Sequence, residues 1–335
     1  MSTELPPPIP PPIPTTIGIH GNASYVNFEF SFFTLPMLLL LLPILYIPIT
    51  VIIILRILVK LLYAIKEKTI NAHLFFAITF SQFMCLLFFL LDVIHLRLPA
   101  TGIFTSWCAS VEPNRFLNVL YALTFYVNYA TMLFPFLVSV MRHILIVCPQ
   151  NHKKVNGTLL RFAIPAILIY PSFFTFFMIP SLGYCFQPGL PYQFGQIQIM
   201  FRGTWFGLRN NYFLLGNTMF WMAACLINNS VLLVKLIRLK ISLSTHVRSQ
   251  KSFKAEVSLT FTTFSMIFSY ATNAMIVISF LFFPGYTYAA IMMRPFGNDL
   301  ETCVVPWVFY LTHPVFRRKN NSANIVIFRR DKLHS

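Results

Sequence analysis

Apolar blocks of 20 or more residues are the feature that most limits how this chain can fold. About 20 apolar residues in a helix span the roughly 30 Å of a bilayer's hydrocarbon core. Soluble domains carry about 25% charged residues, whereas this chain is 10% charged and 57% hydrophobic. Such a chain cannot cover a globule with polar surface. We therefore expect an integral membrane protein whose partner is the lipid bilayer, not nucleic acid, despite a net charge of +16.

Hydropathy in windows of about 19 residues predicts an all-α bundle of seven transmembrane helices. The predicted spans are 32–55, 74–95, 116–141, 159–181, 213–234, 257–283 and 286–312. The first six are nearly free of charge, whereas the seventh contains Arg294, Asp299 and Glu301. The domain order is then an N-terminal segment (1–31), a seven-helix domain (32–312) and a basic tail (313–335). The proline-rich start lacks the features of a signal peptide and predicts a disordered spacer.

The distribution of Lys and Arg predicts the orientation. Twenty of the 25 fall in the first, third and fifth loops and in the tail, and four (Arg97, Arg115, Arg202, Arg209) fall in loops on the other side. Loops rich in Lys and Arg stay in the cytoplasm. We therefore expect the N-terminus outside and the C-terminus inside, which also supports the seventh span.

Three residues are candidates for modification on the outer side. Asn22, in the sequence NAS, is a glycosylation acceptor ahead of the first span. Cys108 and Cys185 lie in the first and second outer loops, where disulfides persist. We expect a bridge between them, the alternative being two unpaired cysteines. The long loop 182–212 is either a lid or binding surface, or a segment that simply packs over the mouth of the bundle.

Polar residues inside the spans are candidates for function because burying them in lipid is costly. Arg294, Asn298 and Glu301 share a face of the seventh helix, with Asp299 to one side of it. Two interpretations remain open: a polar network that joins helices two, three and seven, or a ligand pocket contacted by Asp92 and Arg294. The full candidate set is Asp92, His95, Asn128, Arg294, Asn298, Asp299 and Glu301.

The motifs of common enzymes and cofactor proteins are missing from the sequence. It contains no HExxH, GxSxG or P-loop pattern. The seventh span has no lysine for a retinal Schiff base. We therefore expect no enzyme activity and no cofactor.

The inner end of the third span reads FPFLVSVMRHILIVCPQNHKK, with Arg142 at the membrane boundary. This arginine either extends to the lipid headgroups or contacts helix six or a G protein. The candidate G-protein face consists of Arg142, His143, Lys153, Lys154, Arg248, Lys251 and Lys254.

Three segments resemble the nematode serpentine chemoreceptors of the Srg superfamily, most closely class U (Sru). They are IHGNASYVNFEF, YVNYATMLFPFLVSVMR with the following CPQNHKK, and PWVFYLTHPVFRRK; the resemblance covers residues 19 to about 319. It implies a G-protein-coupled receptor for chemical cues. Arg142 stands where rhodopsin-like receptors have the DRY arginine, with Met141 and His143 replacing its neighbours. Pro306 and Tyr310 stand as in NPxxY, without the asparagine.

The favoured hypothesis is a chemosensory receptor in the plasma membrane, in sensory-neuron cilia, which binds an external small molecule and activates a heterotrimeric G protein. One alternative is a seven-span ligand-gated ion channel of inverted topology, against which the charge distribution argues. Another is a small-molecule transporter, although the sequence shows no repeated halves.

The charge distribution predicts the outcome of a topology experiment. With one epitope tag at each terminus, antibody should stain the N-terminal tag on intact cells and the C-terminal tag only after permeabilisation. Staining of the C-terminal tag alone on intact cells would show that the chain is inverted.

Overall fold

The computed structural model describes residues 18–67, 72–148, 150–242 and 257–317. Its helices are α1 (Ala23–Val26), α2 (Leu35–Leu41), α3 (Pro43–Glu67), α4 (Ala72–Asp92), α5 (Leu98–Ala100), α6 (Thr105–Ser110), α7 (Arg115–Thr131), α8 (Leu133–Val147), α9 (His152–Ile169), α10 (Ser172–Thr175), α11 (Asn210–Ser242), α13 (Phe268–Phe282), α14 (Thr287–Thr312) and α15 (Pro314–Arg317). Short irregular helices are η1 (Val93–Arg97), η2 (Phe176–Met178), η3 (Trp205–Gly207) and η4 (Pro284–Tyr286), and two strands are β1 (Leu182–Phe186) and β2 (Gln198–Arg202).

Six helices in the described part of the chain are long and apolar enough to cross a membrane. They cover Leu35–Tyr63, Ala72–Ala100, Arg115–Val147, His152–Met178, Asn210–Arg238 and Val257–Phe282. The 26-residue helix α14 is the seventh and differs from them by its charged residues. The predicted helical bundle is confirmed, and several helices extend past their predicted ends because a helix can continue beyond the hydrocarbon boundary.

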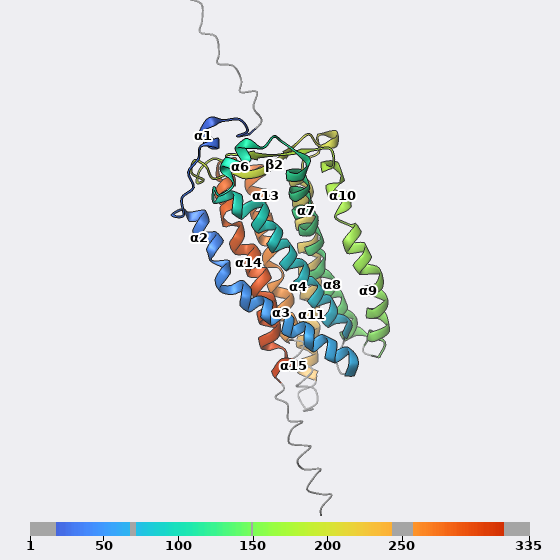
Figure 1. Cartoon of the computed structure of the whole chain (residues 1–335). Coiled ribbons are helices and arrows are strands. Elements are labelled where there is room, and N and C mark those ends of the chain that lie inside the picture. The colour runs from blue at the N-terminus through green and yellow to red at the C-terminus, as the bar shows by residue number, and fades with distance from the viewer. Residues whose placement is uncertain (1–17, 68–71, 149, 243–256, 318–335) are drawn as a thin grey trace, which may run out of the picture.

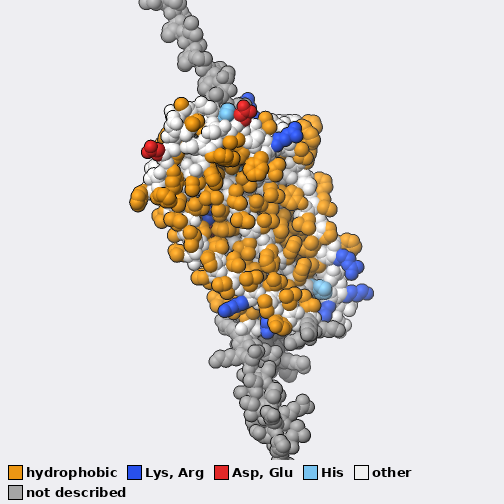
Figure 2. All heavy atoms as spheres, viewed as in Figure 1, with side chains coloured by type: hydrophobic (Ala, Val, Ile, Leu, Met, Phe, Trp, Pro, Cys, Tyr) orange, Lys and Arg blue, Asp and Glu red, His pale blue; other side chains and the backbone are white. Residues whose placement is uncertain are grey.

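The helices run side by side in one bundle, with the N-terminal segment at one end and α15 at the other (Figure 1). The second and third spans are mostly buried, whereas few residues of the first, fourth and fifth are buried inside the bundle. Figure 2 shows the exposed apolar side chains as a broad band, with most of the visible Lys and Arg at the end near α15. A bilayer is the solvent that suits such a surface, because lipid tails are as apolar as the side chains.

Most breaks between helix segments coincide with prolines. Pro43 starts α3, Pro135 follows the break between α7 and α8, and Pro171 precedes α10. Each lacks the N–H that would continue the ladder of hydrogen bonds. The helix over Val257–Phe282 has no proline but is interrupted by a turn at residues 266–267. There the hydroxyls of Thr262 and Thr263 bond to carbonyls one turn earlier, which bends helices.

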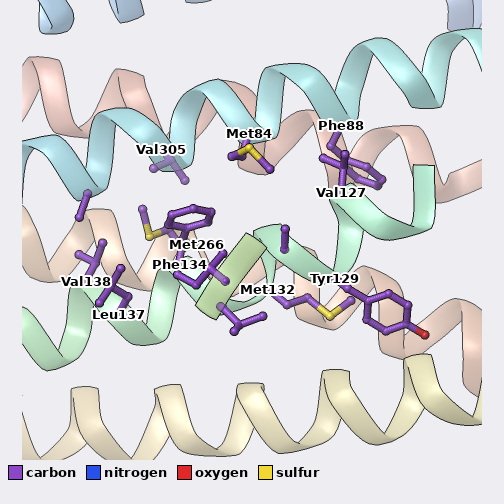
Figure 3. Close-up of a cluster of buried hydrophobic side chains, with 14 of the residues drawn as sticks. Met84, Phe88, Val127, Tyr129, Met132, Phe134, Leu137, Val138, Met266 and Val305 are labelled. Atoms are coloured by element: carbon purple, nitrogen blue, oxygen red, sulfur yellow. The ribbon is translucent and has the colours of Figure 1, made fainter. Parts of the chain in front are cut away.

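The centre of the bundle is a continuous apolar core (Figure 3). Met84 on α4, Phe134 on α8, Met266 on the sixth span and Val305 on α14 meet there, and all are buried. The core fixes how the four central helices pack, and it separates the polar sites at the two ends of the bundle.

One departure from an all-α chain lies in the loop 182–212. Strands β1 and β2 pair antiparallel, with Leu182 opposite Arg202 and Phe186 opposite Gln198. Burial alternates along β1, where Gly183 and Cys185 are buried, and in β2 the buried residues are Gln198 and Ile199. We call this pair the β-hairpin; it lies across the end of the bundle that also holds the N-terminal segment (Figure 1).

Helices α13 and α14 pack tightly against each other at Gly297. A Cβ atom at this position would collide with the side chain of Thr272 on α13, so we expect Gly297→Ala to lower the stability of the bundle. Overpacking of this kind costs about 1–3 kcal/mol. The measurement is the thermal unfolding temperature of the purified protein in detergent.

The matched control is Gly216→Ala on α11, where a Cβ atom meets nothing within 4 Å. This variant should unfold at or slightly above the parent temperature, because Ala favours helix over Gly. Equal unfolding temperatures for the two variants would contradict the close packing of α13 on α14.

Candidate functional site

A single irregular turn at the outer end of the second span creates the site. Residues Val93–Arg97 form a π-helix directly after α4, and such turns are frequent at functional sites. Five residues advance about 140° beyond a full turn in an α-helix, but the wider π turn brings residues five apart close together. Asp92 and Arg97 therefore lie on the same side of the helix, and Arg97 Nε donates to Asp92 Oδ2 at 2.9 Å.

Arg97 also holds the seventh helix. Its Nη1 and Nη2 donate to the two oxygens of Asp299 on α14 at 2.9 and 2.6 Å. This bidentate geometry is the strongest form of the Arg–carboxylate contact. The phenol of Tyr46 on α3 donates to Asp299 Oδ2 as well. We call Asp92, Arg97, Arg294, Asp299 and Tyr46 the outer polar network.

The burial of Arg97 corrects the prediction that this residue lies in an outer loop. Arg97 is 4% exposed, because the helical segment continues past the predicted end to Ala100. Hydropathy gives no reason to bury an arginine here, because a window of sequence does not register ion-pair partners. The two carboxylate partners of Arg97 lie 5 and 202 residues away in the sequence. Its removal from the loop count makes the excess of cations at the other end of the bundle larger.

Arg294 joins the network more loosely than Arg97. Its Nη2 lies 3.3 Å from Asp92 Oδ1, and its guanidinium lies 5.6 Å from the centre of the Phe88 ring. Nε and Nη2 of Arg294 have no hydrogen-bond partner among the described residues. The outer polar network therefore joins the first, second and seventh spans, rather than the second, third and seventh as predicted.

The remaining candidates of the sequence analysis lie close to the network or deeper in the bundle. His95 on η1 contacts the Ile199 carbonyl at 3.3 Å and packs against Tyr121. Asn128 of the third span accepts a hydrogen bond of 3.3 Å from Asn273 of the sixth. Two further candidates, Asn298 and Glu301, are buried on α14.

A cavity of about 370 Å³ opens beside this network. Its walls come from η1, α7, α11, α13 and α14, and β2 with the segment after it closes one side. The volume lies within the range of about 300–1,000 Å³ for small-molecule sites. Of the predicted candidates, His95 and Arg294 line the cavity. Its other walls are mainly aromatic and aliphatic, with Tyr121, Phe125 and Phe280 among them.

Covalent and backbone bonds hold the β-hairpin over the cavity. Cys108 on α6 and Cys185 on β1 form a disulfide, so the bridge ties the hairpin to a short separate helix ahead of α7. The N-terminal segment adds backbone hydrogen bonds from Ile19 to the Cys185 carbonyl, 3.1 Å, and from Gly21 to the Ala109 carbonyl, 2.9 Å. Loop 182–212 thus both packs over the mouth of the bundle and lines the cavity.

At the opposite end, Arg142 on α8 connects the third and sixth spans. It is 1% exposed and donates to the hydroxyls of Thr263 at 2.8 Å and Thr260 at 2.7 Å. Thr263 Oγ1 also lies 3.0 Å from Asn229 Oδ1 on α11, so its single proton is shared between this amide oxygen and the Leu259 carbonyl. Arg142 therefore faces the helices rather than the lipid headgroups. We call its contacts with Thr260 and Thr263 the inner tether.

The other predicted inner residues are spread over several elements. His143 lies 3.0 Å from Lys235, and Lys153 and Lys154 are exposed at the start of α9. Tyr310 on α14 accepts a hydrogen bond of 3.4 Å from Arg56. Pro306 is buried within α14. Arg248, Lys251 and Lys254 lie outside the described residues.

The structure also bears on glycosylation and metal binding. Asn22 is exposed, and its side chain caps α1 by accepting from the backbone of Ser24; its glycosylation stays a prediction. No group of three or more metal-ligating side chains occurs within the described part of the chain.

The family profile "Serpentine type 7TM GPCR chemoreceptor Sru" matches residues 19–319. The chain belongs to the Sru family of serpentine chemoreceptors. The Caenorhabditis elegans protein "Serpentine receptor class U-26" is 60% identical over 261 residues, which cover 78% of this chain and 90% of that protein. The resemblance inferred from the sequence is therefore confirmed, including the class. The Sru match spans both the outer polar network and the inner tether.

The outer polar network predicts a large effect of removing Arg97. Arg97→Gln leaves two buried carboxylates without their main partner, and breaking a buried ion pair costs about 3–5 kcal/mol. The purified variant should unfold at a clearly lower temperature, and Arg97→Lys should recover only part of the loss because Lys cannot make the bidentate contact.

Arg115→Gln is the matched control, since Arg115 is an exposed arginine at the same end of the bundle. It should unfold at the parent temperature. If Arg97→Gln matches this control, the network does not hold the outer ends of the helices together.

Proposed function

We propose that this Sru receptor binds an external small molecule in the cavity beneath the β-hairpin and activates a heterotrimeric G protein at its opposite, basic end. Membership of a serpentine chemoreceptor family favours a receptor over a channel or a transporter. The observation that carries the proposal is the position of the sixth span, which lines the cavity at one end and holds Arg142 at the other. We place the receptor in the plasma membrane of sensory cilia, with the cavity at its extracellular end.

The cavity has the position and walls that a ligand site needs. It is lined by Asn273, Ile276 and Phe280 of α13 and by Ile291 and Arg294 of α14. A ligand that prefers one arrangement of these two helices shifts the equilibrium between arrangements. Helix α13 then transmits the bias toward the inner end.

The turn at residues 266–267 separates the two parts of the sixth span. The part on the inner side carries Thr260 and Thr263, which the inner tether binds to Arg142. Release of this tether frees Arg142 and opens the inner end of the bundle to a G protein. Exposed Lys153 and Lys154 give that end a positive charge, which suits an acidic partner surface.

The inner tether predicts higher basal signalling when its acceptors are removed. Hydrogen bonds to a charged group contribute about 1.5–3 kcal/mol, and 1.4 kcal/mol changes an equilibrium tenfold. The double variant Thr260→Val, Thr263→Val should therefore raise basal G-protein activation about tenfold or more. The readout is dissociation of co-expressed Gα and Gβγ subunits across a panel of Gα subtypes, normalised to surface expression.

Thr262→Val is the matched control, because Thr262 bonds to the Ser258 carbonyl in its own helix. Its basal activity should equal that of the parent. Arg142→Ala removes the proposed G-protein contact and should abolish signalling while surface expression persists. Signalling that is unchanged in Arg142→Ala would refute that role.

A further inference from the structure

The charges around the cavity have one sign. Three arginines line it, Arg202, Arg209 and Arg294, and no Asp or Glu is among its described lining residues. A cleft with charges of one sign between low-dielectric walls concentrates ligands of the opposite sign. The lining therefore favours an anion over a cation or a neutral molecule.

Arg294 is the cation placed to bind such an anion. It is 7% exposed and lines the cavity, and its one described ion pair is with Asp92 at 3.3 Å. Asp92 is already bonded by Arg97 at 2.9 Å, and both oxygens of Asp299 are bonded by Arg97 as well. Nε of Arg294 has no hydrogen-bond partner among the described residues, and Nη2 has only the ion pair with Asp92 Oδ1, an oxygen that accepts no hydrogen bond from the described residues either.

A second unpaired donor lies in the cavity wall. Asn210 on α11 accepts from the Tyr129 hydroxyl at 2.8 Å through Oδ1, so its Nδ2 is the donor, and that atom has no partner among the described residues. A buried polar group without a partner costs about 1–3 kcal/mol. A ligand rich in acceptor oxygens removes that cost at Asn210 and at Arg294 together.

Arg202 and Arg209 differ from Arg294 in their role. Both are exposed and lie on β2 and in the segment after it, at the mouth of the cavity. Exposed charges at a mouth raise the association rate more than the affinity, and salt weakens their effect. A single buried arginine matches a single negative charge, which favours a carboxylate over a doubly charged phosphate.

We propose that the cavity takes an organic carboxylate, whose oxygens bind Arg294 and whose apolar body packs against Tyr121, Phe125 and Phe280. This inference rests on the proposed function for its biological meaning, because it names the chemical class of the cue. The competing account is that Arg294 serves only as a structural partner of Asp92.

The test uses the full-length receptor, purified into nanodiscs of uncharged lipid. Matched probes share one body and differ in the head group: octanoate, octanamide and octylamine, and the aromatic set hydrocinnamate, hydrocinnamamide and phenylpropylamine. At least one carboxylate should raise the unfolding temperature saturably, and its amide and amine should not. The amide and amine also control for partition of the probes into lipid.

Three variants locate the effect. Arg294→Gln should weaken carboxylate binding about thirty-fold or more, which is the lower range for truncating one partner of a buried charge pair. The double variant Arg202→Gln, Arg209→Gln should slow association and reduce its salt dependence; both residues are exposed, so this variant keeps the test open if Arg294→Gln does not fold. Arg115→Gln, outside the cavity, should bind as the parent does.

The proposal is overturned if no carboxylate stabilises the receptor, if the amide or amine does so equally, or if Arg294→Gln keeps the carboxylate affinity. Failure of the proposed function gives a different result. Carboxylates that bind through Arg294 without activating any G protein in cells would leave this inference standing and remove the signalling role. If a neutral or cationic ligand activates G proteins through the receptor and no carboxylate binds, the signalling role stands and this inference fails.

Discussion

The bidentate contact between Arg97 and Asp299 is the interaction on which the outer half of the molecule depends. It joins the second and seventh spans, and through Tyr46 it reaches the first. Ions are costly in a membrane interior unless they are paired, so the contact specifies one arrangement of these helices. The position of η1 follows from it, and η1 carries His95 into the cavity wall. The cavity is therefore shaped by an ion pair that does not itself line it.

Much of the fold could be predicted because hydropathy is a local property. Seven apolar blocks, and the excess of cations at one end, follow directly from windows of sequence. The role of Arg97 could not be predicted, because hydropathy treats an arginine near a span end as a loop residue and says nothing of a carboxylate 202 positions away. Arg294 could be identified as a candidate, since a charge inside a span is visible in sequence. Whether it faced a network or a pocket could not, and in the structure it borders both.

In the sixth span, threonines rather than a proline accompany the interruption of the helix. Thr262 and Thr263 bond to carbonyls of the previous turn beside the interruption at residues 266–267. The sixth span contains no proline, and its helix is interrupted all the same. An interruption of this kind is accompanied by side-chain hydrogen bonds and not by a missing N–H. It can rearrange without breaking a covalent constraint, and Thr263 couples it to the contact with Arg142.

The π turn at Val93–Arg97 has a consequence for how receptors of this design can diverge. Deletion of one residue between Asp92 and Arg97 would restore a regular α-helix in which the two stand four residues apart, so both would stay on one side of the helix. Arg97 would keep its place beside Asp299, while the residues between Asp92 and Arg97 would shift around the helix and change what lines the wall at His95. A single-codon deletion could therefore alter the cavity wall in one step without loss of the ion pair. Evolution of ligand preference in such a receptor need not proceed through successive point substitutions in the pocket.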